Sequence, residues 1–373
     1  MQKKVISFAG VLILIAACAS LASFGGDGAR AAPGARLSPC DSGRSSQFDL
    51  ESTIAFSSTR DDPNHVPVAD AAEIYLMSPD GTNLRRLTHN DAGDGFANLS
   101  PDGKRIVFDS SRISGQTNIS DLFLMNADGS DQTFLTRGSS ATWSPDCKNI
   151  AFHASASGTG TPTRTDPGSA TTDSDIFVAN VDDLVAGVAQ PTDLTNSPGK
   201  VDDDPDWSPD GKHIAYTAHD VGDDPPDVTP PFISNTAEIY IMNADGSGTP
   251  RPLTANTYEE RSPAWSPDSA RIVFSCRTDG GGTVFHICVK DADAAPNDLP
   301  QKLTASSFGD LTPTWSPDGT TILFHRVAPQ PPRGIGPQLW VMNADGTDQR
   351  QLTSPPGLNL LAHWGVLRVH TGR

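Results

Sequence analysis

A five-residue turn phrase, Trp-Ser-Pro-Asp-Gly, recurs through the chain and constrains its fold more than any other feature. Complete or nearly complete copies stand at 143–147, 207–211, 265–269 and 315–319, with a Leu variant at 99–103. Each copy precedes a short apolar segment of the kind that forms a strand in an antiparallel sheet. Self-similarity of this kind indicates a repeat architecture, in which each unit buries its faces against its neighbours.

A second turn phrase completes each unit. Met-Asn-Ala-Asp-Gly occurs at 125–129, 242–246 and 342–346, and Met-Ser-Pro-Asp-Gly occurs at 77–81. A Leu-Thr pair closes every unit, at 87–88, 135–136, 194–195, 253–254, 303–304 and 352–353. Asp-Gly turns supply the positive φ angles that tight hairpins need. We therefore predict six units, each made of four short antiparallel strands, A to D.

The two ends of the chain predict how the units close into a ring. The first unit has strands B (53–57), C (74–77) and D, but no Trp-containing strand A precedes it. Residues 361–364, Leu-Ala-His-Trp, match strand A and are followed by Gly-Val instead of a turn phrase. We expect this last strand to complete the first unit, which removes a free sheet edge. An open solenoid with a frayed tail is the alternative.

The predicted fold class is therefore all-β, a six-bladed β-propeller of four-stranded antiparallel blades over residues 48–367, with a tail at 368–373. One tryptophan marks strand A in five of the blades. These structural repeat residues are Trp143, Trp207, Trp265, Trp315 and Trp364.

The turn phrases and the Leu-Thr strand resemble the WD40-like repeats of the TolB family of six-bladed β-propellers, over residues 48–366. In the namesake of that family, a periplasmic protein, an α/β domain precedes the propeller, and the propeller docks a peptidoglycan-associated lipoprotein. In this chain residues 18–47 stand before the first blade. The resemblance implies the propeller fold and a binding role outside the cytoplasm.

The N-terminus has the proportions of an export signal. Lys3 and Lys4 precede an apolar run over 5–17, which predicts a signal peptide at residues 1–17. The run ends in Ile-Ala-Ala before Cys18 and resembles a bacterial lipobox, in which the cysteine is acylated. Cleavage by the general signal peptidase is the alternative, because Ala-Cys-Ala at 17–19 fits an A-x-A site.

Either route predicts an extracytoplasmic protein, lipid-anchored in the bacterial cell envelope or secreted. Residues 18–47 are rich in Gly, Ala, Ser and Pro and lack periodicity, so we expect a flexible tether. The chain has 45 acidic against 27 basic side chains and a formal net charge of -18. This charge repels phosphate backbones and anionic lipids. We expect no nucleic-acid partner, membrane contact through the lipid anchor alone, and a monomer.

Catalytic motifs are absent from the sequence: it has no G-x-S-x-G, H-E-x-x-H or C-x-x-C pattern. Asp202, Asp204 and Asp206 imitate the start of a Ca²⁺ loop, but Trp207 takes the place of the required glycine. We interpret them as a solvated acidic entry to a strand and expect no metal or cofactor. His153 and His325 both follow a strand-B aromatic residue. They leave open an alternative function, a lyase or hydrolase acting on an oligosaccharide with a channel metal.

Basic and acidic residues recur at one end of the blades. Arginines follow strand B at Arg60, Arg112, Arg277 and Arg326, and acids precede strand A at Asp94, Asp203, Glu260 and Asp310. Both positions fall at the same end of a hairpin, so we expect ion pairs between blades, with an anion site as the alternative. The candidate binding residues are Asp203, Asp206, Glu260, Asp310, Arg60, Arg112, Arg277, Arg326 and His363.

Loop lengths differ between the two faces of the predicted disc. The A–B and C–D turns are short and repetitive and share one face. The B–C loops on the other face vary widely, at about 60–73, 112–120, 153–175, 217–237, 277–284 and 326–337. Irregular loops on a rigid scaffold commonly bind ligands. We expect an envelope or extracellular protein, peptide or glycan to bind this face and the mouth of the axial channel. Neutral surface drift is the alternative.

Four cysteines remain beyond Cys18, and an extracytoplasmic compartment permits disulfides. Cys276 ends strand B of one blade and Cys288 lies in its strand C, so we predict that they face each other and are bonded. Two reduced cysteines in the core are the alternative. A bond between Cys40 and Cys147 would staple the tether to an A–B turn, and this pairing stays open.

Overall fold

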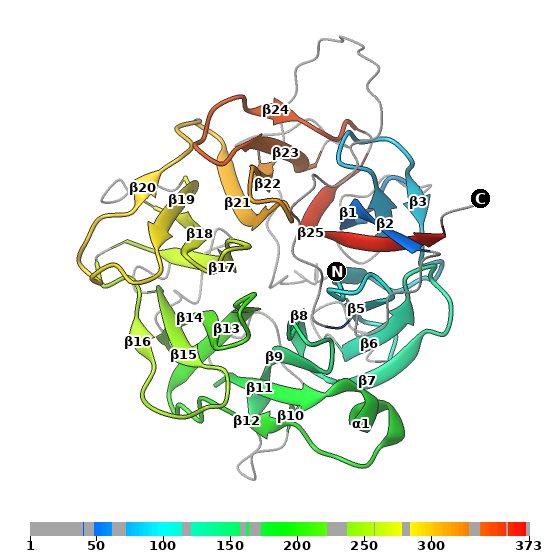
Figure 1. Cartoon of the computed structure of the whole chain (residues 1–373), viewed down its shortest axis with the longest axis horizontal. Helices are drawn as coiled ribbons and strands as arrows, with labels where there is room; N and C mark the ends of the chain where they lie inside the picture. Colours follow the sequence, from blue (N-terminus) through cyan, green and yellow to red (C-terminus); the bar gives the residue numbers. More distant parts are fainter. Residues whose placement is uncertain are drawn as a thin grey trace, which may run out of the picture.

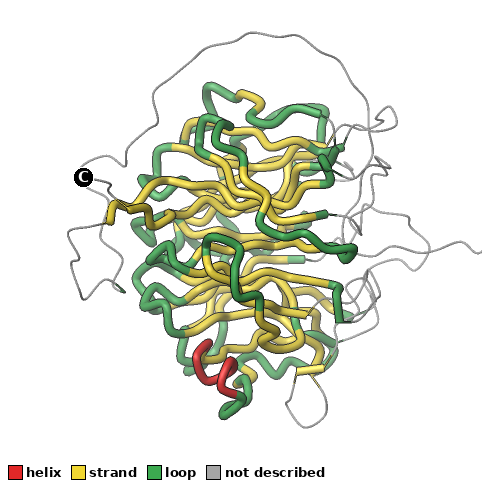
Figure 2. Tube along the Cα trace, turned by 90° about the vertical axis from the view of Figure 1, so that its right-hand side faces the viewer, coloured by secondary structure: helices red, strands yellow, loops and turns green. Residues whose placement is uncertain are grey.

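The computed structural model describes residues 40, 48–61, 72–113, 121–156, 162–163, 173–221, 237–256, 258–277, 284–327, 336–355 and 357–370. Over these residues the chain forms six antiparallel sheets around a central axis (Figure 1). The predicted six-bladed β-propeller is confirmed. Seen from the side, the strands run between the two faces of the disc (Figure 2). Within the described part of the chain, no helix is long and apolar enough to span a membrane.

Each blade begins with an innermost strand and proceeds outwards. Blade 1 contains β25 (Asn359–His370), β1 (Phe48–Ser58), β2 (Glu73–Met77) and β3 (Arg85–Arg86). Blade 2 contains β4 (Asp94–Leu99), β5 (Arg105–Ser110), β6 (Asp121–Asn126) and β7 (Thr133–Arg137). Blade 3 contains β8 (Ser139–Trp143), β9 (Asn149–Ala156), β11 (Asp175–Asn180) and β12 (Thr192–Asp193), and β10 (Pro162–Thr163) also pairs with β9.

The second half of the ring follows the same order. Blade 4 contains β13 (Lys200–Trp207), β14 (His213–Asp220), β15 (Glu238–Asn243) and β16 (Arg251–Pro252). Blade 5 contains β17 (Glu260–Trp265), β18 (Arg271–Cys276), β19 (His286–Asp291) and β20 (Gln301–Lys302). Blade 6 contains β21 (Gly309–Trp315), β22 (Thr321–Val327), β23 (Gln338–Asn343) and β24 (Arg350–Gln351).

The ring closes as expected, by pairing of the last strand with the first. In Figure 1 the red β25 lies beside the blue β1, and the register places Ile54 opposite Trp364. The pairing continues outwards to Phe48 opposite His370. Strand β25 therefore extends three residues past the expected boundary at 367, because β1 reaches back far enough to pair with it.

The A–B turn phrase is a self-contained hydrogen-bonded unit. In blade 5, Ser266 Oγ donates to Asp268 at 2.6 Å and accepts from the Arg271 amide at 2.9 Å. The fifth residue of the phrase has positive φ in every copy: 67° at Gly103, 60° at Cys147, 77° at Gly211, 59° at Ser269 and 72° at Gly319. The hydrogen bonds hold this conformation even where the residue is not glycine, although a side chain there costs about 1–2 kcal/mol.

A bulge in each innermost strand was not predicted from the sequence. It is marked by a non-glycine residue with positive φ, at Phe96, Ser140, Asp204, Ser262, Thr312 and Leu361. The bulge turns backbone amides toward the preceding blade. The Ser262 amide donates to Thr217 Oγ1 at 3.2 Å, and the Thr312 amide donates to Ser275 Oγ at 3.0 Å. The bulge thus ties neighbouring blades together near the axis.

The hydrophobic core is divided among the blade interfaces. Val107 and Leu122 of blade 2, for example, pack with Trp143 and Phe177 of blade 3. Trp143 Nε1 also donates to the Asn98 carbonyl of blade 2 at 3.1 Å. The repeat tryptophans of blades 5, 6 and 1 are likewise buried, and that of blade 4 is half-buried. Each of these side chains fills an interface between blades, so no blade is stable alone.

A short helix replaces the expected C–D turn in blade 3. Helix α1 (Val181–Ala186) begins at the N-cap Asn180, whose side chain accepts from the Asp183 amide, and ends at Gly187 with φ 65°. Asp182 pairs with Arg105 of blade 2 at 2.8 Å. The sequence 180–187 lacks the Asn-Ala-Asp-Gly phrase, which is why a hairpin was not favoured there.

The described residues form two disulfides. Cys276 and Cys288 are bonded with Cα atoms 5.8 Å apart, but they are not directly opposite. The register places Cys276 opposite His286 and Cys288 opposite Phe274, so the bond joins diagonal neighbours on one side of the sheet. The predicted bond is confirmed, but the expectation of a directly facing pair was wrong by two residues, because the ladder continues closer to the connecting loop and pairs Cys276 with His286.

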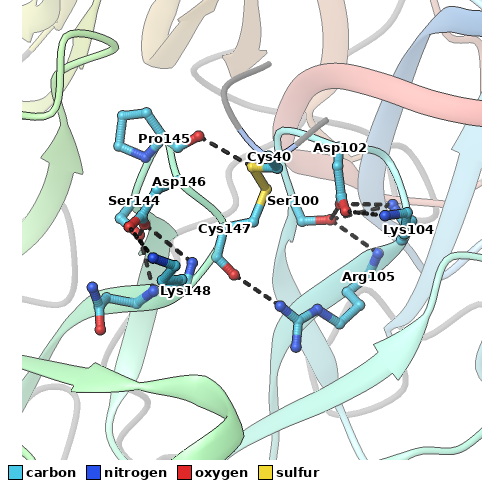
Figure 3. The surroundings of a disulfide bond; sticks show 11 residues. Cys40, Ser100, Asp102, Lys104, Arg105, Ser144, Pro145, Asp146, Cys147 and Lys148 are labelled. Carbon is cyan, nitrogen blue, oxygen red and sulfur yellow. Dashed lines mark hydrogen bonds and ion pairs between the residues drawn. A yellow bond between two sulfur atoms is a disulfide. The ribbon is translucent and has the colours of Figure 1, made fainter. Parts of the chain in front are cut away.

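The second disulfide joins Cys40 to Cys147 in the A–B turn of blade 3, as Figure 3 shows, with Cα atoms 5.8 Å apart. Arg105 of blade 2 donates to the Cys147 carbonyl at 2.8 Å. This bond attaches residue 40 to the face of the disc that carries the A–B turns.

We predict that Trp364→Ala destabilises the whole ring, because the indole is 8% exposed and Nε1 donates to Ser52 at 2.7 Å across the closing pair. The free energy of unfolding in urea should fall by about 3–5 kcal/mol. Leu299→Ala, at a side chain 77% exposed, is the control and should change little. Truncation after Leu358 should be more damaging still, and an unchanged melting temperature for that variant would contradict closure.

Candidate functional site

A ring of polar side chains lies where the innermost strands begin. We define the entry position as the residue two before each bulge residue: Asp94, Gly138, Asp202, Glu260, Asp310 and Asn359. Outside blade 3, its backbone amide is bonded to the residue before strand C of the preceding blade. Examples are Asp94 to the Ala72 carbonyl at 2.8 Å and Asn359 to the Pro337 carbonyl at 2.9 Å. The entry positions therefore share the face of the B–C loops.

In blade 2 the entry carboxylate belongs to a compact unit with an arginine and two aromatic rings. Arg112 donates to both oxygens of Asp94, at 3.0 and 3.2 Å, and to Ser110 Oγ at 2.8 Å. Its guanidinium lies 5.4 Å from the centre of the Phe108 ring and 4.6 Å from that of Phe123. The aromatic pair and the carboxylate thus enclose the cation from two sides.

Blades 6 and 1 repeat this unit. Arg326 donates to Asp310 at 2.6 and 3.0 Å and lies 4.3 Å from the centre of the Trp340 ring. Arg60 donates to Asn359 at 2.6 Å and lies over Phe56 and Tyr75 at 5.4 and 5.3 Å. We call this arrangement the arginine unit.

The arginine unit corrects the expectation of ion pairs between blades for Asp94 and Asp310, whereas Asp203 does lie 3.9 Å from Arg261 of the next blade. Asp310 and Arg326 are direct partners in the register of β21 and β22, so the pair lies within one sheet. The reason is that strand A begins opposite the end of strand B in the same hairpin. These arginines are therefore held by their own blades.

Blade 5 departs from the pattern. Arg277 pairs with Glu259 at 3.2 Å and lies 4.7 Å from the centre of the Phe285 ring. The Cys276–Cys288 disulfide takes the place of the strand-B serine and of the strand-C aromatic residue. In blade 3 the entry position is glycine, and Ala156 stands where blades 1 and 2 have the arginine of the unit.

Glu260, the entry residue of blade 5, faces a second carboxyl group, that of Glu238. Asn256 joins the two, since its backbone amide donates to Glu238 at 2.8 Å and its side chain donates to Glu260 at 2.7 Å. Burial, together with the nearby charge of Glu238, raises the pKa of Glu260 to about 9. The pair therefore holds a proton at neutral pH.

The aspartates of β13 are less solvated than the sequence indicated. Asp202 is 2% exposed, and Asp206 accepts from Thr142 Oγ1 of blade 3 at 3.2 Å and from the Trp265 amide of blade 5 at 2.7 Å. Burial raises the pKa of Asp202 to about 7 and that of Asp206 to about 6. Asp203 lies 3.9 Å from Arg261, and its pKa is raised by burial and then by Asp204. These aspartates are buried because they lie on an innermost strand that packs against the neighbouring blades.

The histidines singled out in the sequence are packed into the blades. Burial lowers the pKa of His325 and of His363 to about 4, and also lowers the pKa of His153. His363 Nδ1 accepts from the Leu99 amide at 3.3 Å, and His325 Nδ1 lies 2.6 Å from Thr312 Oγ1. Among the described residues, no group of three or more His, Cys, Asp or Glu side chains could hold a metal ion.

Several sequence predictions lie outside the described residues. These are the signal peptide, Cys18, the tether apart from Cys40, and the central parts of the six B–C loops. The described ring of entry residues borders those loops.

Comparison with known proteins agrees with this architecture. TolB from Acinetobacter baumannii superposes with a TM-score of 0.61 at 18% identity, covering 84% of this chain and 66% of that one. A TolB-designated protein from Agrobacterium tumefaciens gives 0.57 at 18% identity, covering 87% and 100%. Kuenenia stuttgartiensis hydrazine synthase gives 0.61 at 16% identity, covering 86% and 48%. At these identities the likeness shows the fold, and the TolB-type propeller expected from the sequence is confirmed at that level.

Comparison of sequences alone finds less similarity than comparison of structures. No family model matches the chain. A segment of 81 residues is 33% identical to the uncharacterized peptidase YuxL of Bacillus subtilis, which amounts to 22% of this chain and 10% of that protein. The chain thus matches about a tenth of the length of this relative.

We predict that Glu260 makes stability fall as pH rises. The native carboxyl keeps its proton up to a pKa of about 9, whereas the unfolded side chain loses it near 4.3. Its contribution is therefore full below about pH 4.3 and is lost by about pH 9. Glu260→Gln, which stays neutral, should weaken this decline in urea-unfolding free energies measured at pH 5.5, 7.0 and 8.5.

Other buried acids also titrate in this range, so the variant is compared with the wild type at each pH. Glu51→Gln, at an exposed side chain of β1, controls for removal of one charge. An identical pH slope in Glu260→Gln and the wild type would show that Glu260 is ionised in the native state.

Proposed function

We propose that the protein is an exported β-propeller scaffold that binds a protein, peptide or glycan partner on the B–C loop face. The observation that carries the proposal is the contrast between the two faces. The turn face consists of repeated phrases whose polar groups bond to one another, as in Ser316 with Asp318 at 2.6 Å. The opposite face carries the ring of buried carboxyl groups, and within the described residues Asp202 of that ring has no arginine beside it.

The two disulfides support export, since such bonds persist mainly in oxidising compartments. The fold shared with TolB proteins agrees with a place in the cell envelope. We expect acylation of Cys18 to anchor the chain there.

The Cys40–Cys147 bond would then place the attachment of the tether. It holds residue 40 on the turn face, 22 residues after Cys18, and a chain of that length spans at most about 75 Å. The attachment point is thus on the face opposite the acidic ring, which leaves the B–C loop face open to partners.

We predict that replacing residues 222–236, between β14 and β15, by a short Gly-Ser link leaves the propeller folded and lowers partner recovery at least about tenfold in affinity capture from the native envelope. Replacement of the turn Asn243–Ser247 of the same blade by a Gly-Ser link is the control and should leave partner recovery unchanged. Loss of the partner only in the turn variant would place binding on the other face.

Anchoring gives a separate prediction. Cys18→Ala should move the protein from the membrane fraction to the soluble fraction and abolish lipid labelling, because acylation needs the thiol. Ser20→Ala, two residues away, should leave fractionation unchanged. A Cys18→Ala protein that remains in the membrane fraction and still carries label would contradict the lipid anchor.

A further inference from the structure

Blade 4 keeps the acid and the aromatic pair of the arginine unit but has no arginine among its described residues at that place. Tyr216 of β14 and Tyr240 of β15 face each other with ring centres 5.9 Å apart, as Phe108 and Phe123 do at 5.8 Å in blade 2. Asp202 holds the entry position. Asp220 stands four residues after the strand-B aromatic residue, where blades 1 and 2 have Arg60 and Arg112.

A pocket of about 220 Å³ lies in this part of blade 4, lined by Asp202, Tyr216, Tyr240, Glu238, Asp220 and Lys200 among others. This is smaller than the 300–1,000 Å³ typical of whole small-molecule ligands and suits a single side chain. Asp202 is 2% exposed, and its Oδ2 atom has no hydrogen-bond partner in the described structure. The nearby Thr195 hydroxyl and Ser197 amide donate to Asp175, and the Thr195 and Ser197 side chains also lie close enough to Asp202 to offset part of the rise in its pKa.

The basic residues that line the pocket are Lys200 and His219, and neither carries a guanidinium group. Lys200 lines the pocket, but its ammonium pairs with Asp220 at 2.5 Å, and 46% of its side chain is exposed. No described cation lies over the Tyr216 or Tyr240 ring. The adjoining sequence 222–236 contains no Lys, Arg or His, so the B–C loop of this blade has no basic side chain to offer.

We propose that this blade-4 pocket binds the guanidinium group of an arginine side chain presented by a partner protein or peptide. Blades 2 and 6 enclose a guanidinium between a carboxylate and two aromatic rings, and blade 1 does so with Asn359 in place of the carboxylate, which favours this cation over others. A buried carboxylate and two aromatic faces bind a planar cation with matched geometry. The inference rests on the proposed function and deepens it, because it gives the chemistry of the partner at that face.

The test uses the purified full chain labelled with 3-fluorotyrosine and the capped peptide acetyl-Gly-Arg-Gly-amide. The chain has four tyrosines, Tyr75, Tyr216, Tyr240 and Tyr258, so ¹⁹F spectra report each one. We expect saturable shifts at Tyr216 and Tyr240 and none at Tyr75, which already lies under Arg60. The matching citrulline peptide, equal in shape but neutral, should bind at least about tenfold more weakly. Equal binding of the two peptides, or shifts at all four tyrosines, would overturn the proposal.

Two variants test the pocket from opposite directions. Asp202→Asn should weaken binding of the arginine peptide at least about tenfold, since it removes the buried carboxylate. Asp220→Arg should restore an internal arginine unit and abolish the shifts. Asp245→Asn, in an exposed C–D turn of the same blade, should bind as the wild type does. Undiminished binding by Asp220→Arg, or by a folded Asp202→Asn, would overturn the proposal.

A separate variant tests Arg164, in the sequence of the blade-3 loop, as a source of the guanidinium within the chain itself. Arg164→Ala should leave peptide binding unchanged, and a tenfold gain would show that the pocket belongs to the protein's own arginine. The peptide titration and the loop exchange at 222–236 can fail independently. If the arginine peptide does not bind but replacement of 222–236 still removes the partner, this inference is wrong and the proposed face stands. If the peptide binds but replacement of 222–236 leaves partner recovery unchanged, the proposed face is wrong and this inference stands.

Discussion

The backbone hydrogen bond at the entry positions is the interaction on which the rest of the propeller depends. The backbone amide at the start of an innermost strand donates to the carbonyl of the residue before strand C of the preceding blade. Examples are Glu260 to Ala237 at 2.8 Å and Asp310 to Phe285 at 2.9 Å. The same bond from Asn359 to Pro337 closes the ring between blade 6 and blade 1. Because the amides are fixed in this way, the entry side chains must lie in the confined space beside the next hairpin.

In this confined space a charged side chain is poorly hydrated, and the blades compensate for the lost hydration in different ways. A carboxylate held there loses hydration and needs a partner. Blades 2 and 6 supply an arginine, and blade 1 replaces the acid by Asn359 while keeping Arg60. Blade 5 keeps Glu260 protonated against Glu238, and blade 3 has glycine in place of the acid. In blade 4 Asp202 has no arginine unit, and burial raises its pKa to about 7, so its carboxyl group is only partly relieved by protonation at neutral pH.

The sequence predicted the fold because turn chemistry is local. Trp-Ser-Pro-Asp-Gly forms its hydrogen bonds within six residues, and Trp364 without that phrase indicated the closing strand. The site was harder to predict because it depends on register. The bulge at residues such as Phe96 and Thr312 has no fixed residue type, yet it decides which side chains meet. Asp202 looked solvated for this reason, and the incomplete arginine unit of blade 4 became visible only after the blades could be compared position by position.

The arginine units are distributed unevenly around the ring, so the two sides of the B–C loop face differ in charge. The arginine units belong to blades 6, 1 and 2, which adjoin one another around the ring, whereas the acids without an arginine unit belong to the adjoining blades 4 and 5. The loop between β14 and β15 adds Asp223, Asp224 and Asp227 to the sequence of blade 4. Charges separated by more than about 8 Å are largely screened at physiological ionic strength, so a partner would sense this asymmetry only close to the surface. The net charge of -18 therefore sets the general attraction for basic partners, while the arrangement of blades 4 and 5 determines where on the face a basic side chain gains most.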